Sequence, residues 1–284
     1  MKHNNNNNNS NNNWLSQPVT ETQISRGGRL WLYVIAALVM IFLVMPTLLV
    51  IPMSFSNSQY LEFPPRQWSL RWYQSYFSSA SWMQATATSF KAGVLTALVA
   101  TPLGTMAAYG LLVSRIRHAG YLTLLLLMPM VVPVILIGIG VFYAYVKLQL
   151  VNTLAGLVLA HSMLAIPVVM MVVSSALKTF DLNQEMVARS LGASRLEAFR
   201  MVTFPQIRFS IFTGAVLAFL TSFDEIIVSL FVSGGDHSTL TRNMFNALRD
   251  QVDPTIAAIS TLIVASTSLM LAVTQFIGKP ERPR

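Results

Sequence analysis

Six long apolar segments alternate with polar segments along the chain. Each is long enough to cross the hydrocarbon core of a bilayer, which takes about 20 helical residues. In lipid an unpaired backbone polar group costs several kcal/mol, so spanning segments of this kind are expected to be helical. The pattern predicts an all-α polytopic membrane bundle with six transmembrane helices, at residues 30–53, 92–114, 121–146, 153–177, 209–233 and 255–278.

Prolines inside several of these segments predict bent helices. Proline removes a backbone donor and clashes with the preceding turn, and a membrane bundle tolerates it where neighbouring groups satisfy the freed carbonyls. A bundle of kinked helices suits a protein that changes shape. The prolines concerned are Pro46, Pro52, Pro102, Pro129, Pro133 and Pro167.

Polar segments flank this predicted transmembrane domain of residues 30–278. Residues 1–29 include a long run of asparagine and too few apolar side chains to offset the entropy of ordering. We expect a disordered tail there, either native or appended. Residues 279–284 form a short polar tail at the other end.

Composition narrows the chemistry. Hydrophobic residues make up 54% of the chain and charged residues 11%, against about a quarter charged in an ordinary soluble domain. The chain has no cysteine, which excludes disulfides and thiolate sites. Its histidines are scattered one per segment, without the clustering of a metal or catalytic site. We therefore expect a transport protein with no metal site rather than an enzyme.

The distribution of basic residues predicts the orientation. The net charge of +8 could suit nucleic acid, but in a membrane protein excess Lys and Arg marks cytoplasmic loops. With the N-terminus inside, 13 basic residues fall on the inner side and five on the outer side. Both termini are therefore predicted to be cytoplasmic. No basic stripe interleaved with aromatic residues indicates a nucleic-acid partner.

The segment at residues 184–205 is polar and helix-forming, although it lies between two apolar segments. It follows the fourth predicted span, on the inner side. Gly192 and Ala193 interrupt it, so we expect two short amphipathic helices joined by a glycine elbow, within a loop at about residues 178–206. The alternative is an amphipathic hairpin that rests on the bilayer surface.

The spacing within this segment resembles a conserved loop of one transport family. That loop, in the permease subunits of binding-protein-dependent ATP-binding-cassette importers, reads Glu-Ala-Ala, three residues, Gly, nine residues, Ile, one residue, Leu-Pro. Here three residues separate Ala188 from Gly192, and nine residues separate Gly192 from Val202. Phe204 and Pro205 follow at the family's spacing. Glu185 lies one position before the family's Glu.

The resemblance covers residues 30–278 and implies a type I importer permease fold. It implies that the loop is a coupling helix seated on a separate ATPase subunit, since this chain has no phosphate-binding loop and would hold no cofactor itself. ATP and Mg²⁺ would then bind the ATPase. The residues implied in coupling are Glu185, Ala188, Arg189, Ser190, Leu191, Gly192, Ala193, Ser194 and Pro205.

The family also implies the partners and the location. They are a homologous permease subunit, two ATPase subunits and a periplasmic solute-binding protein, assembled in the bilayer of a bacterial inner membrane. Rival readings of the hydropathy are a secondary transporter or a channel. The former should show broken helices at matching positions in two repeat halves, which the pattern lacks.

Two adjacent carboxylates, Asp224 and Glu225, lie within the fifth apolar segment. Charges there are costly, so they should face a polar cavity or a partner. On one continuous helix, steps of four place Thr221, Glu225, Ser229 and Ser233 on a single stripe. The candidate translocation path is Thr221, Asp224, Glu225 and Ser229. Alternatively, the acids are protonated or pair with a buried Arg, Lys or His, such as His161.

Acids along a path attract cations. Residues 218–229 also resemble the second, C-type permeases of spermidine/putrescine importers, in which an acidic pair follows a serine. That resemblance implies a small cationic substrate such as a polyamine. Permeases for other amine-bearing solutes, namely amino acid derivatives, aminophosphonates or opines, remain the alternative.

Overall fold

A computed structural model of the chain describes residues 29–114, 117–250 and 252–277. The predicted all-α fold is confirmed, and no β-strand occurs in these ranges. The predicted tails lie outside them, apart from Arg29. The helices are α1 (Leu30–Met53), α2 (Arg71–Ser78), α3 (Ala80–Val113), α4 (Ala119–Val131), α5 (Val134–Leu148), α6 (Leu154–Thr179), α7 (Asn183–Ser190), α8 (Arg195–Ala198), α9 (Phe204–Phe223), α10 (Ile227–Val232), α11 (Leu240–Asp250) and α12 (Thr255–Ile277).

Among the described residues, five helical stretches are long and apolar enough to cross a membrane. A sixth span results if α4 and α5 count together, since the pair passes the same test with a bend of 96° between its halves. The six predicted spans are consistent with this arrangement. The stretches are Leu30–Met53, Ala80–Val113, Leu154–Thr179, Arg195–Phe223 and Thr255–Val273.

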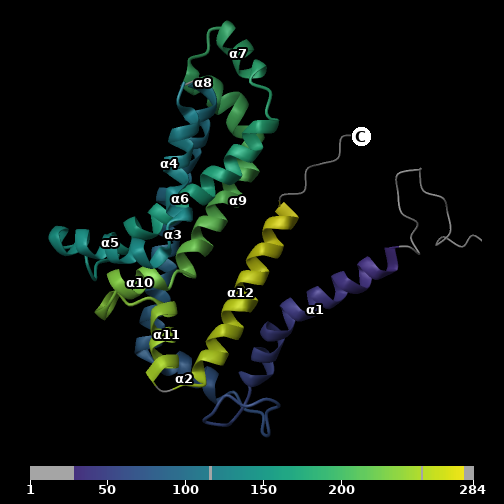
Figure 1. Ribbon diagram of the computed structural model, residues 1–284, viewed down its shortest axis with the longest axis vertical. Coiled ribbons are helices and arrows are strands. Elements are labelled where there is room, and N and C mark those ends of the chain that lie inside the picture. The colour runs from purple at the N-terminus through teal and green to yellow at the C-terminus, as the bar shows by residue number, and fades with distance from the viewer. Residues whose placement is uncertain (1–28, 115–116, 251, 278–284) are drawn as a thin grey trace, which may run out of the picture.

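The bend between α4 and α5 divides the predicted span at residues 121–146 into two helices. Pro133 caps the start of α5, and Val132 before it adopts an extended backbone, as the steric demand of a following proline favours. α5 therefore runs across the bundle instead of continuing α4 (Figure 1). Uniform hydropathy hides this break, because both halves are equally apolar.

Helices α3, α6 and α9 pack together and enclose the main core. Small residues let these helices approach closely, as is typical of membrane bundles. Gly104 of α3 lies so near α6 that a Cβ atom added to it would be 2.7 Å from Cβ of Val169. The buried core residues are Ala100, Ala108, Ala165, Val169, Met170, Val173, Leu177, Ile207 and Ala218.

Replacing Gly104 by Ala is expected to lower the apparent unfolding temperature in detergent. The added methyl group has no room, and overpacking of this kind costs about 1–3 kcal/mol. Gly110, six residues later on the same helix, is the matched control, because a Cβ atom there would meet nothing within 4 Å. Equal unfolding temperatures for Gly104→Ala and Gly110→Ala would contradict the close α3–α6 packing.

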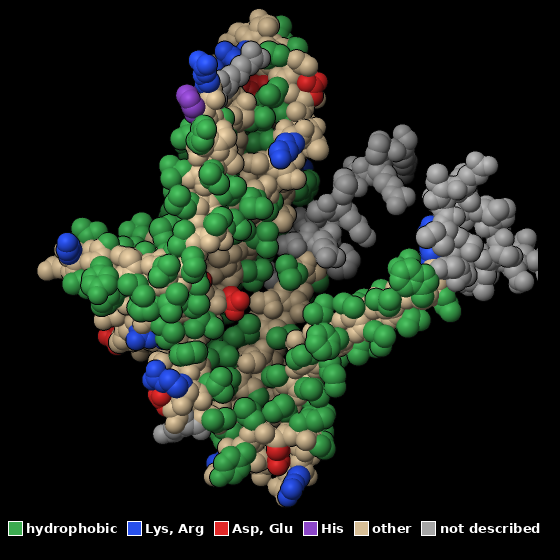
Figure 2. All heavy atoms as spheres, in the orientation of Figure 1, with side chains coloured by type: hydrophobic (Ala, Val, Ile, Leu, Met, Phe, Trp, Pro, Cys, Tyr) green, Lys and Arg blue, Asp and Glu red, His purple; other side chains and the backbone are tan. Residues whose placement is uncertain are grey.

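The two ends of the bundle differ in character (Figure 1). Helices α7 and α8 form a hairpin at one end, and α2 and α11 lie at the opposite end. Figure 2 shows basic side chains gathered near the hairpin, and hydrophobic side chains over α1 and much of the bundle. Helix α1 contacts α12 and buries none of its residues within this chain.

Candidate functional site

The hairpin between α6 and α9 is built from two short helices, as the sequence predicts. Helix α7 begins at Asn183, whose backbone N–H donates to the Asp181 carboxylate (3.0 Å). Gly192 has φ +101°, a backbone conformation that side-chain-bearing residues rarely adopt, and it turns the chain between α7 and α8. The predicted glycine elbow is therefore confirmed at Gly192.

A capping box begins α8. The Ser194 hydroxyl accepts from the Glu197 N–H (3.3 Å), and the Glu197 carboxylate accepts from the Ser194 N–H (2.8 Å). The second arm of the hairpin thus has a fixed starting point beside the elbow.

Most of the residues predicted for coupling lie on the outer surface of this hairpin. Leu191, at the tip, exposes 85% of its area, and apolar side chains on both sides of it are also exposed. Exposed apolar side chains that gather at a polar hairpin make it a candidate interaction surface. We call the outer surface formed by the exposed apolar residues Met186, Val187, Leu191, Leu196 and Met201 the hairpin surface. Exposed or half-exposed among the predicted residues are Ala188, Arg189, Ser190, Leu191, Gly192, Ala193, Ser194 and Pro205.

Glu185 is the exception among the predicted coupling residues. Only 4% of its area is exposed, and its carboxylate accepts hydrogen bonds from the Tyr109 hydroxyl of α3 (2.5 Å) and the Thr203 hydroxyl (2.8 Å). It therefore does not lie on the hairpin surface. Local periodicity could not show this, because one hydrogen-bond donor lies 76 residues away in the sequence.

The hairpin continues into α9 without an interruption. Residues Phe199–Thr203 form a π-helical turn, and α9 starts at Phe204, with Pro205 in its first turn. Proline is tolerated there because the first helical N–H groups need no intrahelical acceptor. Helix α9 thus begins five residues before the predicted position 209, within an apolar stretch that runs from Arg195 to Phe223.

The acidic pair lies at a break in the fifth span. Helix α9 ends at Phe223, Asp224 caps it, and α10 begins at Ile227. The Glu225 carboxylate accepts from the backbone N–H of Val228 (2.9 Å) in the first turn of α10. The expectation of one continuous helix carrying a polar stripe from Thr221 to Ser233 is therefore wrong. Asp224 occupies the C-cap position of α9, and the Glu225 carboxylate helps to start α10.

Three of the four predicted path residues meet at one cavity. Thr221, Asp224 and Glu225 line a space of about 530 Å³, closed on its other side by Ile263 and Thr267 of α12. Asp224 is exposed and Glu225 is half-buried. Within the described ranges no cationic side chain forms an ion pair with either acid, since Arg249 and Asp250 make the single pair found there. The cavity is thus acidic and uncompensated.

Ser229 lies elsewhere, in a buried network around His161. The imidazole Nδ1 is 2.7 Å from the Ser222 hydroxyl, and Nε2 is 3.1 Å from the Ser229 hydroxyl. The Ser229 hydroxyl is also 2.8 Å from the Glu225 carbonyl, to which it donates. His161 is therefore a hydrogen-bonded packing residue between α6, α9 and α10, and it does not pair with the acids.

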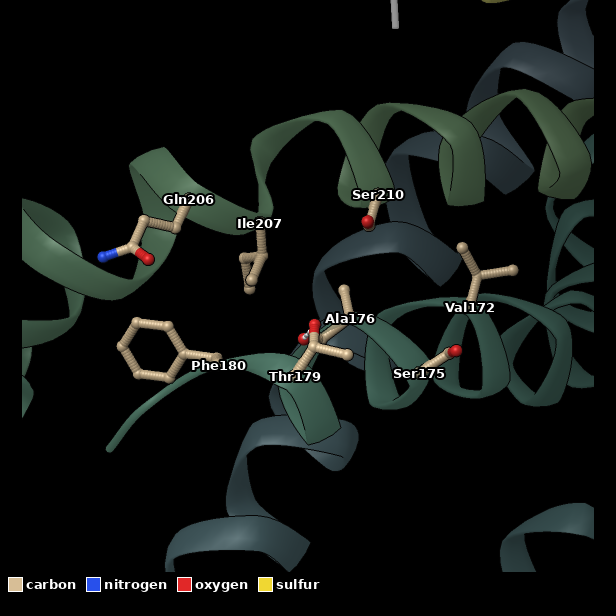
Figure 3. A pocket seen from close by; sticks show the side chains of 8 residues that line it. All are labelled: Val172, Ser175, Ala176, Thr179, Phe180, Gln206, Ile207 and Ser210. Atoms are coloured by element: carbon tan, nitrogen blue, oxygen red, sulfur yellow. Dashed lines mark hydrogen bonds between the residues drawn. The ribbon is translucent and has the colours of Figure 1, made fainter. Parts of the chain in front are cut away.

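A polar groove between α6 and α9 escaped the sequence analysis. Its space of about 610 Å³ lies at the hairpin end of the two helices. Figure 3 shows Ser175 and Thr179 of α6 on one side, and Gln206 and Ser210 of α9 on the other. The spacing of four within each pair was the signal, because residues four apart share one face of a helix.

Comparison with known proteins decides the family. Residues 100–279, more than half of the chain, match the family described as the binding-protein-dependent transport system inner membrane component. The chain belongs to this family. The predicted resemblance to importer permeases is thereby confirmed, and the relatives are transport permeases, not enzymes.

Individual relatives refine this result. The chain is 32% identical over 247 residues to the putrescine transport system permease protein PotI of Escherichia coli K12, covering 84% of this chain and 88% of PotI. It is 26% identical over 238 residues to the spermidine/putrescine permease PotC of the same strain, covering 84% and 90%. A bacterial ABC transporter for alginate import shares the fold, with a TM-score of 0.65 at 16% identity over 92% of this chain and 98% of the other.

Proposed function

We propose that the chain is the permease subunit of an ATP-driven importer for a small organic cation, and that the hairpin at 184–205 docks a separate ATPase. The observation that carries this proposal is the pairing of the exposed hairpin surface with an uncompensated acidic cavity, at the two ends of α9. Membership of the inner-membrane transport family supports it.

The hairpin surface supports the docking step. Exposing an apolar side chain such as Leu191 to water costs free energy. Burial of that side chain in a groove of a partner would remove this cost. Arg189 and Arg195 lie close beside it and would favour a partner with acidic side chains at the groove rim. ATP and Mg²⁺ would bind that partner, so the permease itself would need no cofactor.

The acidic cavity supports a cationic substrate. Asp224 and Glu225 lack a cationic partner among the described residues, and a low-dielectric site focuses their field. PotI and PotC are named for putrescine and spermidine transport. We therefore favour a polyamine, with other amine-bearing solutes, such as amino acid derivatives, aminophosphonates or opines, as the second candidate.

The polar groove is a candidate for the inner part of the same route. It lies between the helices that flank the hairpin, and its hydroxyl and amide groups could replace part of a cation's hydration shell. The cavity and the groove both open to the outside of this chain, as half of a path would. A homologous permease subunit would supply the other half, with two ATPase subunits and a periplasmic binding protein completing the importer.

The proposed orientation places both termini and the hairpin in the cytoplasm. Helix α12 runs from the α11 end toward the hairpin end, which agrees with an even number of crossings (Figure 1). The excess of basic residues in the segments on that side supports the same orientation. A secondary transporter or a channel is the less favoured candidate, since neither needs the hairpin surface.

Co-purification tests this function. Expressed with the neighbouring genes of its own locus, the tagged chain is expected to recover a phosphate-loop ATPase in stoichiometric amount. Reconstituted with its binding protein, that complex should import putrescine only when ATP is supplied. Uptake into liposomes by the permease without any ATPase would instead favour a secondary transporter or a channel.

A further inference from the structure

The buried carboxylate of Glu185 is not available to a docked ATPase. It nevertheless carries two hydrogen bonds, from Tyr109 (2.5 Å) and from Thr203 (2.8 Å). Burying a carboxylate is costly unless hydrogen bonds compensate it. Arg189 and Arg195 line the small space next to Glu185 and add favourable charge. The hairpin thus maintains a costly group where a simple apolar contact would also fill space.

The three bonded residues belong to three different elements. Glu185 lies in α7, Tyr109 lies near the hairpin end of α3, and Thr203 is fully buried in the turn that leads into α9. The Tyr109 ring also packs edge-to-face on Phe199, with 4.7 Å between ring centroids. The carboxylate therefore bridges α3 to the start of α9 through α7.

The covalent connections of the hairpin make this bridge significant. The backbone joins the hairpin to α6 and to α9, but α3 is not adjacent to it in the chain. Helix α3 nevertheless extends over 34 residues and packs along both α6 and α9. A displacement of α7 would therefore act directly on α3, through the hydrogen bond between Glu185 and the Tyr109 hydroxyl.

We propose that Glu185 is a positioning residue that clamps the hairpin to α3 and α9, so that movement of the docked hairpin displaces both helices together. This inference rests on the proposed docking of an ATPase. Without the clamp the hairpin still docks, but it turns at Gly192 and at the segment before α7 without moving α3. ATP hydrolysis is then less tightly linked to transport.

The test removes one hydroxyl at a time from the complete importer in liposomes, with putrescine and the loaded binding protein. Tyr109→Phe keeps the ring on Phe199, and Thr203→Val keeps the side-chain volume. Both variants are expected to recover the ATPase in wild-type amount. The putrescine imported per ATP hydrolysed should fall at least about fivefold, which corresponds to a loss of about 1 kcal/mol of coupling.

Two controls separate the clamp from a general structural role. Thr203→Ser, unlike Thr203→Val, keeps the hydroxyl, so its transport-to-ATP ratio should be near the wild-type value. Asp250→Asn changes an exposed carboxylate far from the hairpin, in α11, and should leave that ratio unchanged. The clamp is refuted if Tyr109→Phe and Thr203→Val keep the wild-type ratio, if Thr203→Ser is as impaired as Thr203→Val, or if the ATPase is lost from the variants. Failure of the wild-type chain to recover any ATPase refutes the docking itself.

Discussion

Replacement of Gly192 by Asp is expected to abolish uptake while the protein still inserts into the membrane. Gly192 has φ +101° at the elbow, so any side chain there is strained by about 1–2 kcal/mol. The space around it is open, so nothing in this chain collides with the new carboxylate. The defect should therefore arise where the hairpin meets the ATPase. Uptake in vesicles and recovery of the ATPase with the tagged variant measure it.

Two further variants sharpen this test. Leu191→Asp leaves the elbow backbone unchanged and places a charge on the most exposed residue of the hairpin surface, so it should also lose the ATPase. Gly120→Asp introduces the same carboxylate at an exposed glycine in the first turn of α4, where a Cβ atom would meet nothing within 4 Å. It should transport normally. Normal uptake by Gly192→Asp and Leu191→Asp would argue against docking through the hairpin surface.

Hydropathy predicted the spans well where one apolar segment forms one uninterrupted helix. Residues 30–53 coincide with α1, and the segment at 153–177 differs from α6 by one residue at its start and two at its end. Helix α3 starts twelve residues before the apolar segment at 92–114. The residues from Ala80 onward include polar and aromatic side chains, which depress hydropathy without interrupting the helix.

The broken helices were harder to predict, because hydropathy depends on the composition of a segment and carries no information on the direction of its helix axis. Pro133 suggested a kink, but the 96° turn depends on the extended backbone at Val132. In the fifth span, Asp224 and Glu225 were predicted to lie within one continuous helix, whereas they lie at the break between α9 and α10. Short polar side chains and carboxylates often satisfy free backbone groups at helix ends.

The features of the candidate site that depend on residues close together in the sequence could be predicted, and those that depend on distant residues could not. The glycine elbow follows from residues close together in the chain, and it appeared as expected. The roles of Glu185 and Ser229 depend on Tyr109 and His161, which are 76 and 68 residues away. Such contacts exist only once α3, α6 and α9 have packed, so no local pattern contains them.

Helix α9 connects the two parts of the proposed mechanism. Its first turn adjoins the hairpin and its last turn adjoins the acidic cavity, and its 20 residues span about 30 Å at 1.5 Å per residue. Because its core-facing residues are held between α3 and α6, α9 is expected to move as a rigid unit with them. Displacement at the hairpin would then change the walls of the cavity.

Combining Asp224→Asn with Glu225→Gln is expected to raise the apparent KM for putrescine uptake at least about tenfold. Two unit charges about 6 Å apart at an effective dielectric constant of about 20 attract by about 3 kcal/mol, and water in the cavity screens part of that. The amide oxygen introduced by Glu225→Gln can still accept the hydrogen bond from the Val228 N–H, so the start of α10 is preserved. Uptake of labelled putrescine over a range of concentrations gives the KM.

The design separates the charge of the acids from their structural role. Glu225→Ala loses the hydrogen bond to Val228 and should reduce the amount of folded protein, whereas Glu225→Gln should not. Asp250→Asn removes an exposed acid that pairs with Arg249 and does not line the cavity, and it should transport as the wild type does. An unchanged KM in the double variant would show that the acids do not attract the substrate. Glu225 would then matter only through the hydrogen bond that it accepts at the start of α10.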